Sequence, residues 1–96
     1  MRIYKAKQEN IPQIKYILTA LRIGGWGFSL YIRSSYIKSH ILNNTCFIMK
    51  EDNKVVGVIC LEFKKNNCEI EVLAVKKRMR AKGIGRRLVN YAIQWC

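Results

Sequence analysis

The chain has 96 residues, half of them hydrophobic, and a formal net charge of +12 at pH 7. This length and apolar content predict one globular domain spanning residues 1–96 and exclude a disordered chain. The longest apolar stretch, residues 55–61, is too short for a membrane helix, which needs about 20 residues, and the N-terminus has no apolar signal-peptide core. We therefore expect a cytoplasmic protein that does not cross a membrane.

The cysteine and histidine content argues against a metal site. The four cysteines form no C-x-x-C pair, and His40 is the only histidine. We expect His40 to be structural, because no cysteine or carboxylate stands at ligand spacing from it. Seven of the eighteen basic residues lie between Lys76 and Arg87, and such a cluster attracts anionic ligands, nucleic acid among them.

The first half of the chain reads as a short strand followed by two helices. Residues 1–5 are the predicted strand. Asn10 can cap the next helix, with Gln13 at the reciprocal capping-box position. Apolar residues at helical spacing predict that this helix covers residues 11–22. A glycine-rich connection then leads to a second predicted helix over residues 28–42.

The second half is rich in strands until its last segment. Strands are predicted over residues 45–50, 55–64 and 68–75, and the short polar turns between them indicate an antiparallel meander. An apolar stripe at helical spacing marks a final helix, in which we expect the aromatic residues to be buried; its members are Ile84, Leu88, Tyr91, Ala92 and Trp95.

A glycine motif stands between the last strand and the last helix. It has the spacing R-x-x-G-x-G and reads Arg80, Ala81, Lys82, Gly83, Ile84, Gly85. The first N–H groups of a helix are unpaired and carry partial positive charge, and glycines allow a ligand to approach the backbone. The loop lacks the third glycine of a Rossmann motif and the Lys-Ser/Thr of a P-loop. It nevertheless predicts a site for a phosphorylated ligand.

The strand, the basic loop and the R-x-x-G-x-G spacing resemble motif A of the GNAT superfamily of N-acetyltransferases. The order strand, helix, helix, three antiparallel strands, loop and helix resembles the N-terminal portion of the GNAT fold. The resemblance implies an α+β fold in which an antiparallel meander is flanked by helices. Family members continue with a strand, a helix and two strands that this sequence lacks. It is therefore compatible with a fragment of a longer protein, a natural short form, half of a composite site, and a remnant that binds coenzyme A without turnover.

The resemblance also implies a reaction and a set of contacts. Acetyl-CoA would be the co-substrate, and a primary amine would accept the acetyl group. Leu73 N–H would donate to the thioester carbonyl oxygen, while Ala74 and Val75 would bond the pantetheine arm like an added strand. The pyrophosphate would be held by Arg80, Ala81, Lys82, Gly83, Ile84 and Gly85, with charge added by Arg86.

Two glutamates are candidates for the general base. Glu69 and Glu71 alternate along one strand and should share a face. By resemblance, Glu69 matches the position of the general-base glutamate in the histone-acetyltransferase branch. A carboxylate in a partly apolar cleft can take the amine proton. The alternative is that both are solvent-facing residues. Trp26 either lines the acceptor site or simply packs.

A rival interpretation is a small basic module that binds nucleic acid or another acidic partner. We do not favour it, because Tyr91 and Trp95 read as core residues and not as stacking platforms. The strand that ends at Val75 lacks the neighbour it has in the family, and such an edge invites pairing with another copy. A homo-oligomer is therefore also expected.

Overall fold

The computed structural model describes residues 1–20 and 33–95, and its centre is a four-stranded sheet. In chain order the elements are β1 (Arg2–Lys5), the 3-10 helix η1 (Gln8–Asn10), α1 (Ile11–Thr19), α3 (Ser34–Leu42), β2 (Cys46–Glu51), β3 (Lys54–Lys64), β4 (Asn67–Val75), the 3-10 helix η2 (Lys77–Lys82) and α4 (Ile84–Ile93). The three strands of the meander lie within one residue of their predicted bounds.

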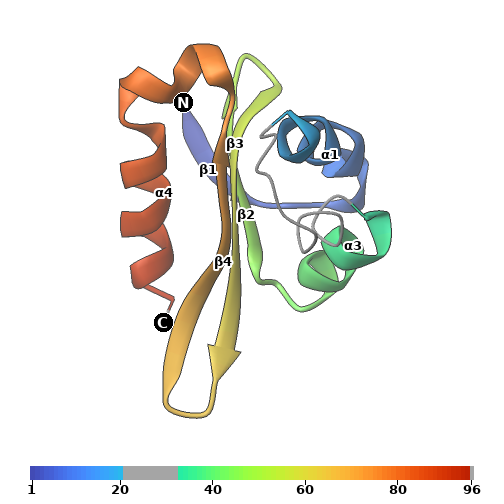
Figure 1. The fold of residues 1–96 in the computed structure, drawn as a ribbon, viewed down its shortest axis with the longest axis vertical. Helices are drawn as coiled ribbons and strands as arrows, with labels where there is room; N and C mark the ends of the chain where they lie inside the picture. Colours follow the sequence, from blue (N-terminus) through green and yellow to red (C-terminus); the bar gives the residue numbers. More distant parts are fainter. Residues whose placement is uncertain (21–32, 96) are drawn as a thin grey trace.

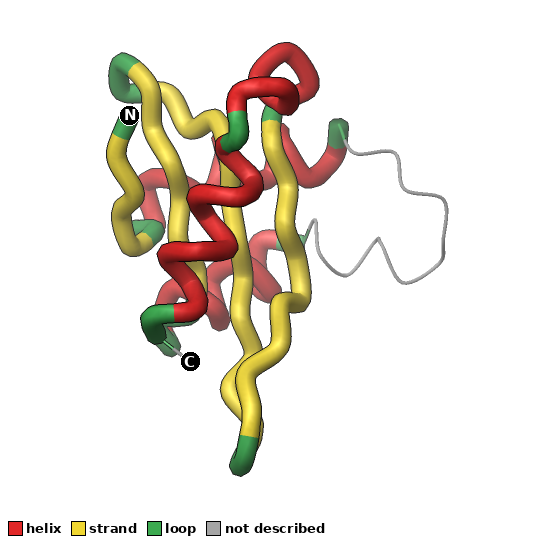
Figure 2. Tube along the Cα trace, turned by 90° about the vertical axis from the view of Figure 1, so that its left-hand side faces the viewer, coloured by secondary structure: helices red, strands yellow, loops and turns green. Residues whose placement is uncertain are grey.

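The sheet is antiparallel throughout, and its strand order β1-β2-β3-β4 follows the chain. Helices α1 and α3 cover one face of the sheet, and α4 covers the other (Figure 1). Figure 2 shows α4 lying across its face, while the β3–β4 hairpin extends past the helices. Within the described part of the chain, β4 is an edge strand, so one side of its backbone pairs with no strand.

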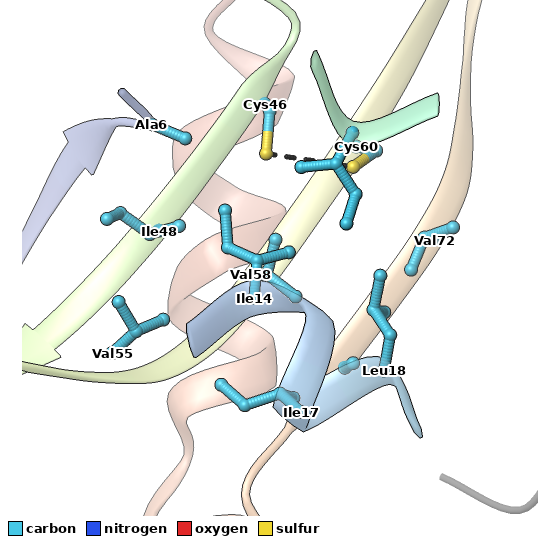
Figure 3. Close-up of a cluster of buried hydrophobic side chains, with 12 residues drawn as sticks. Ala6, Ile14, Ile17, Leu18, Cys46, Ile48, Val55, Val58, Cys60 and Val72 are labelled. Atoms are coloured by element: carbon cyan, nitrogen blue, oxygen red, sulfur yellow. Dashed lines mark hydrogen bonds between the residues drawn. The ribbon is translucent and has the colours of Figure 1, made fainter. Parts of the chain in front are cut away.

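Two cores follow from the two covered faces. One lies between the sheet and α1 with α3 (Figure 3), and its fully buried members include Ile14, Leu18, Ile37 and Val58. The other lies under α4 and includes Phe47, Ile59, Ile84 and Leu88. Successive residues of β3 point into opposite cores, which explains why β3 reads as a continuous apolar run.

The start of α1 differs from the predicted capping box. Asn10 Oδ1 accepts the N–H of Lys7 at 2.8 Å and so closes the preceding 3-10 turn. Gln13 does not reach back to Asn10, because its Oε1 accepts the N–H of Val55 at 2.8 Å. The helix ends at Thr19, ahead of the predicted bound. Trp26 and the predicted start of the second helix lie outside the described residues.

The aromatic end of α4 also differs from the prediction. Tyr91 is half-buried, and Trp95 is 45% exposed, because it lies beyond the last turn of the helix. Both rings contact Phe47, at centroid distances of 5.4 and 5.5 Å. Lys5 Nζ lies 4.8 Å from the Trp95 ring, so this tryptophan combines core contact with a cation–π interaction at the surface.

Candidate functional site

The connection between β4 and α4 is anchored at three points. The buried side chain of Met79 fixes η2 to the core under α4. Arg80 Nε donates to the carbonyl oxygen of Val75 at 3.2 Å, which ties the loop to the strand end. Ile84 is fully buried and fixes the first turn of α4. Ala81, Lys82 and Gly83 lie between these anchors and are exposed, so the neighbouring residues hold their backbone in place.

Gly83 makes the turn from the 3-10 helix into α4. Its φ is +74°, a left-handed conformation that costs a residue with a Cβ about 1–2 kcal/mol. An added Cβ would meet nothing within 4 Å, so the space beside this backbone is open. The first hydrogen bond of the helix runs from Arg87 N–H to Gly83 O at 3.1 Å. The N–H groups ahead of it lack a partner within the helix.

Gly57 lets α4 lie close to the sheet. A Cβ at this position would lie 2.9 Å from Ile84 Cγ2 and 2.9 Å from Leu88 Cδ1. The sequence analysis gave Gly57 no role, because close packing between β3 and α4 is not visible in the sequence. The first turn of α4, which carries the second glycine of the motif, therefore depends on a glycine in a distant strand.

A basic pocket of about 680 Å³ lies beside the loop, on the side of α1. Tyr16, Ile17 and Ala20 line it from α1, and Val75 lines it from the end of β4. The remaining lining is basic and consists of Lys76, Lys77, Arg78 and Arg80. The pocket can therefore attract an anion to the end of the edge strand.

Glu71 is set apart from the regular ladder by a β-bulge. Cys60 pairs with Val72 and Leu61 with Ile70, so Glu71 is the extra residue on its strand. A bulge re-aims the side chain it carries. The Glu71 carboxylate reaches α3 and lines a pocket of about 420 Å³ that also contains Tyr36, Ser39, His40 and Glu62.

Two side chains of α3, Tyr36 and His40, meet at the Glu71 carboxylate. The hydroxyl of Tyr36 donates to Oε1, and His40 Nε2 lies 3.1 Å from the same oxygen. The other ring nitrogen, His40 Nδ1, lies 2.6 Å from Thr45 Oγ1. The sequence predicted a structural His40 because no carboxylate stands at ligand spacing along the chain, but the bulge turns Glu71 toward α3 and brings its carboxylate to the His40 ring.

The two carboxyl groups of this pocket differ in acidity. Burial would raise the pKa of Glu71, but hydrogen bonds with Tyr36, Glu62 and His40 outweigh it and lower the pKa below its usual value. The hydrogen bond with Glu71 and the like charge of that carboxylate raise the pKa of the exposed Glu62. Glu71 is therefore the more acidic of the two carboxyl groups.

Glu69 has a different environment from Glu71. Its carboxylate lies 3.2 Å from Lys64 Nζ, and both side chains are 49% exposed. It faces Glu62 across the β3–β4 ladder, further from the loop than Glu71. Strand β4 thus presents Glu69 at the surface, whereas Glu71 is held by helix α3.

The match to known proteins agrees with this arrangement. The model of the acetyltransferase (GNAT) family matches residues 11–96. The chain belongs to the GNAT family. No curated protein sequence matches it.

Solved structures show that the GNAT fold is shared. PaiA N-acetyltransferase from Thermoplasma acidophilum, in complex with coenzyme A, has a TM-score of 0.80 at 18% identity, over 97% of this chain and 69% of its own. Ard1 from Thermoplasma volcanium has a TM-score of 0.81 at 19% identity, over 99% of this chain and 62% of its own. N-acetylglutamate synthase from Neisseria gonorrhoeae, in complex with coenzyme A and N-acetylglutamate, has a TM-score of 0.77 at 23% identity, over 97% of this chain and 22% of its own.

The GNAT chain therefore spans about two thirds of the first two of these structures. Over residues 1–20 and 33–95, no helix is long and apolar enough to cross a membrane. In the same residues, no group of three or more His, Cys, Asp and Glu side chains could hold a metal ion.

Proposed function

We propose that this chain carries out the acyl-CoA half of a GNAT reaction, in which an acetyl group passes from acetyl-CoA to a primary amine. The observation that carries the proposal is the junction of β4 and α4 in a chain of this family. There an edge strand, a basic loop, a left-handed glycine and an open helix N-terminus follow one another within residues 73–86.

The phosphates of the co-substrate fit the loop. In this proposal, the backbone N–H groups of residues 80–85, which run from the end of η2 into the first turn of α4, bind the pyrophosphate. Lys82 and Arg86 add positive charge. The exposure of Arg80, Lys82 and Gly83 supports this role. Ile84 contributes its backbone only, since its side chain is fully buried.

The acyl arm fits the free edge of β4. Pantetheine carries amide groups and can pair with Ala74 and Val75 as an added strand. The N–H of Leu73 then donates to the thioester carbonyl oxygen, where negative charge develops during attack. The unpaired edge of β4 within the described sheet supports this assignment.

Glu71 is the proton acceptor in this proposal, and Glu69 is the second candidate. Glu71 precedes Leu73 by two residues, lines a pocket and is held by Tyr36 and His40, whereas Glu69 pairs with Lys64 at the surface. The amine nitrogen forms a bond to the thioester carbon, and its proton passes to Glu71. The C–S bond breaks, and the thiolate leaves with the electron pair and takes a proton from water.

Calorimetric titration with acetyl-CoA tests the cofactor half of the proposal. We expect saturable binding that persists in moderate salt, where binding to a nucleic acid would weaken steeply. A saturating ligand at 100 times its Kd should also stabilise the fold by about 2.7 kcal/mol in thermal melts. No binding of acetyl-CoA or of coenzyme A would refute the proposal.

Valine substitutions in the motif locate the binding site. Gly85→Val should abolish acetyl-CoA binding, because a branched side chain would cover the N–H groups of the first turn. Gly83→Val should do the same and also strain the left-handed turn. Circular dichroism should show that the meander remains folded in both variants. Unchanged affinity in both would place the phosphates elsewhere.

Amine acetylation tests the chemical half. With a panel of primary amines, Glu71→Gln should lower the turnover rate by about 100-fold while leaving acetyl-CoA affinity unchanged. The matched control is Glu69→Gln on the same strand, which we expect to stay within a few-fold of the wild type. A large loss of turnover in Glu69→Gln with little change in Glu71→Gln would make Glu69 the base. Binding without turnover of any amine would instead favour a chain that only binds coenzyme A.

A further inference from the structure

Helix α3 presents two donors to a single carboxylate oxygen. Tyr36 and His40 lie four residues apart, so their side chains share a helix face, and their rings meet edge to face at a centroid distance of 4.7 Å. The Tyr36 hydroxyl and His40 Nε2 both contact Oε1 of Glu71. Two donors on one oxygen fix the orientation of the carboxylate as well as its position.

Thr45 allows the His40 ring to keep this contact in either protonation state. Its Oγ1 lies 2.6 Å from His40 Nδ1 and 3.2 Å from the His40 carbonyl oxygen. When the ring is neutral with its proton on Nε2, the Thr45 hydroxyl donates to Nδ1. When the ring is protonated, Nδ1–H donates to Oγ1, and the hydroxyl turns to the carbonyl oxygen. In both states Nε2–H points at Glu71.

We propose that Tyr36 and His40 are positioning residues that hold Glu71 ready to accept the proton of the acceptor amine. This inference rests on the proposed function, because it concerns the same transfer. His40 acts in it as a hydrogen-bond donor, and its own gain or loss of a proton is not needed. The sequence predicted a structural role for His40 and none for Tyr36.

The other charges around Glu71 show why such donors are needed. Glu62 approaches it from β3, and two neighbouring carboxylates disfavour the ionisation of both. Lys64 pairs with Glu69 and offsets this only in part, since it lowers the pKa of Glu62 less than Glu71 raises it. Cys60 is a buried thiol whose pKa is raised by a hydrogen bond with Cys46 and by burial, so it stays neutral and adds no negative charge. Tyr36 and His40 therefore help to make Glu71 the more acidic of the two carboxyl groups.

Three variants separate donation from mere packing. His40→Ala and Tyr36→Phe each remove one donor, and we expect each to lower amine acetylation at pH 7 by roughly tenfold, because the carboxylate loses its fixed orientation toward the amine. The acid limb of the pH–rate profile should move to higher pH. His40→Gln restores an N–H donor that cannot titrate and should stay within about threefold of the wild type. Acetyl-CoA affinity should not change in any of the three.

A second readout does not depend on turnover. Carbon-13 NMR of the labelled glutamate carboxyls should show the Glu71 titration midpoint rising in His40→Ala and Tyr36→Phe, but little in His40→Gln. Because His40 is the only histidine, its ring nitrogens can be followed without ambiguity in the wild type. They should show a proton on Nε2 across the titration.

The outcomes are distinct. A Glu71 midpoint that is equal in all variants would overturn the inference, as would His40→Gln failing as badly as His40→Ala, since the ring would then act as more than a donor. Wild-type protein that acetylates no amine would count against the proposed function, whereas the NMR titration would still decide whether α3 holds Glu71. Thermal melts of each variant identify any loss that comes from unfolding.

Discussion

The close approach of α4 to β3 makes Gly57→Ala the most informative single substitution. The new Cβ would lie 2.9 Å from one methyl of Ile84 and 2.9 Å from one methyl of Leu88. Both side chains are fully buried, so neither can turn into solvent, and α4 itself must shift. Overpacking of this kind costs about 1–3 kcal/mol. In a domain of this size each kcal/mol lowers Tm by roughly 4–8 °C.

The same shift should reach the candidate acyl-CoA site. Gly83 and Gly85 begin α4, so a helix pushed off the sheet carries the open N–H groups with it. We expect Gly57→Ala to weaken acetyl-CoA binding although it lies on a strand and touches no part of the loop. Circular dichroism melts give the stability, and calorimetry on the folded variant gives the affinity.

Gly85→Ala is the matched control for stability. Its Cβ would lie 3.9 Å from Leu73 Cδ2 and 3.9 Å from Val75 Cγ2, which is ordinary contact, and alanine favours the helix by about 0.5–1 kcal/mol. Its Tm should be equal or higher. Adding Leu88→Ala to Gly57→Ala should cost less than the sum of the two single changes, because one clashing methyl is gone. An unchanged Tm and affinity for Gly57→Ala would refute the reasoning.

Three further predictions concern charge and thiol chemistry. Because the pKa of Glu71 is lowered on folding, its carboxylate stabilises the fold at neutral pH. This contribution is lost as the pH falls from about 4, the ordinary glutamate pKa, through the lowered value. The free energies of unfolding of wild type and Glu71→Gln, measured in urea, should therefore converge in acid. Cys46 and Cys60 are both buried, and a hydrogen bond with Cys46 and burial raise the pKa of Cys60, so neither of these two thiols should react with iodoacetamide at pH 8 until the protein unfolds. Peptide mass spectrometry showing fast labelling of Cys46 or Cys60 in the folded protein would contradict this. Lys64→Gln should leave the free energy of unfolding nearly unchanged, since both Lys64 and its partner Glu69 are half-exposed; a clear loss in denaturant titration would show that the pair matters.

The sequence was most reliable where a feature depends on neighbours along the chain. Alternation and short turns predicted the three strands of the meander within one residue. The R-x-x-G-x-G spacing placed Gly83 at the start of a helix, where the structure has a left-handed turn. The capping box failed for the opposite reason, because Gln13 bonds Val55, 42 residues away, instead of its own helix.

By itself, then, the sequence determined the family, the meander and the loop, because hydrophobic period and glycine spacing are local properties of the chain. Only the tertiary structure decided which glutamate is held and by what. The bulge that turns Glu71 toward α3 arises from strand pairing, and its partners Tyr36 and His40 lie 35 and 31 residues away. Likewise, only the packing of α4 on β3 shows why Gly57 must lack a side chain. Contacts of this kind depend on how faces meet in space, and no spacing along the chain encodes them directly.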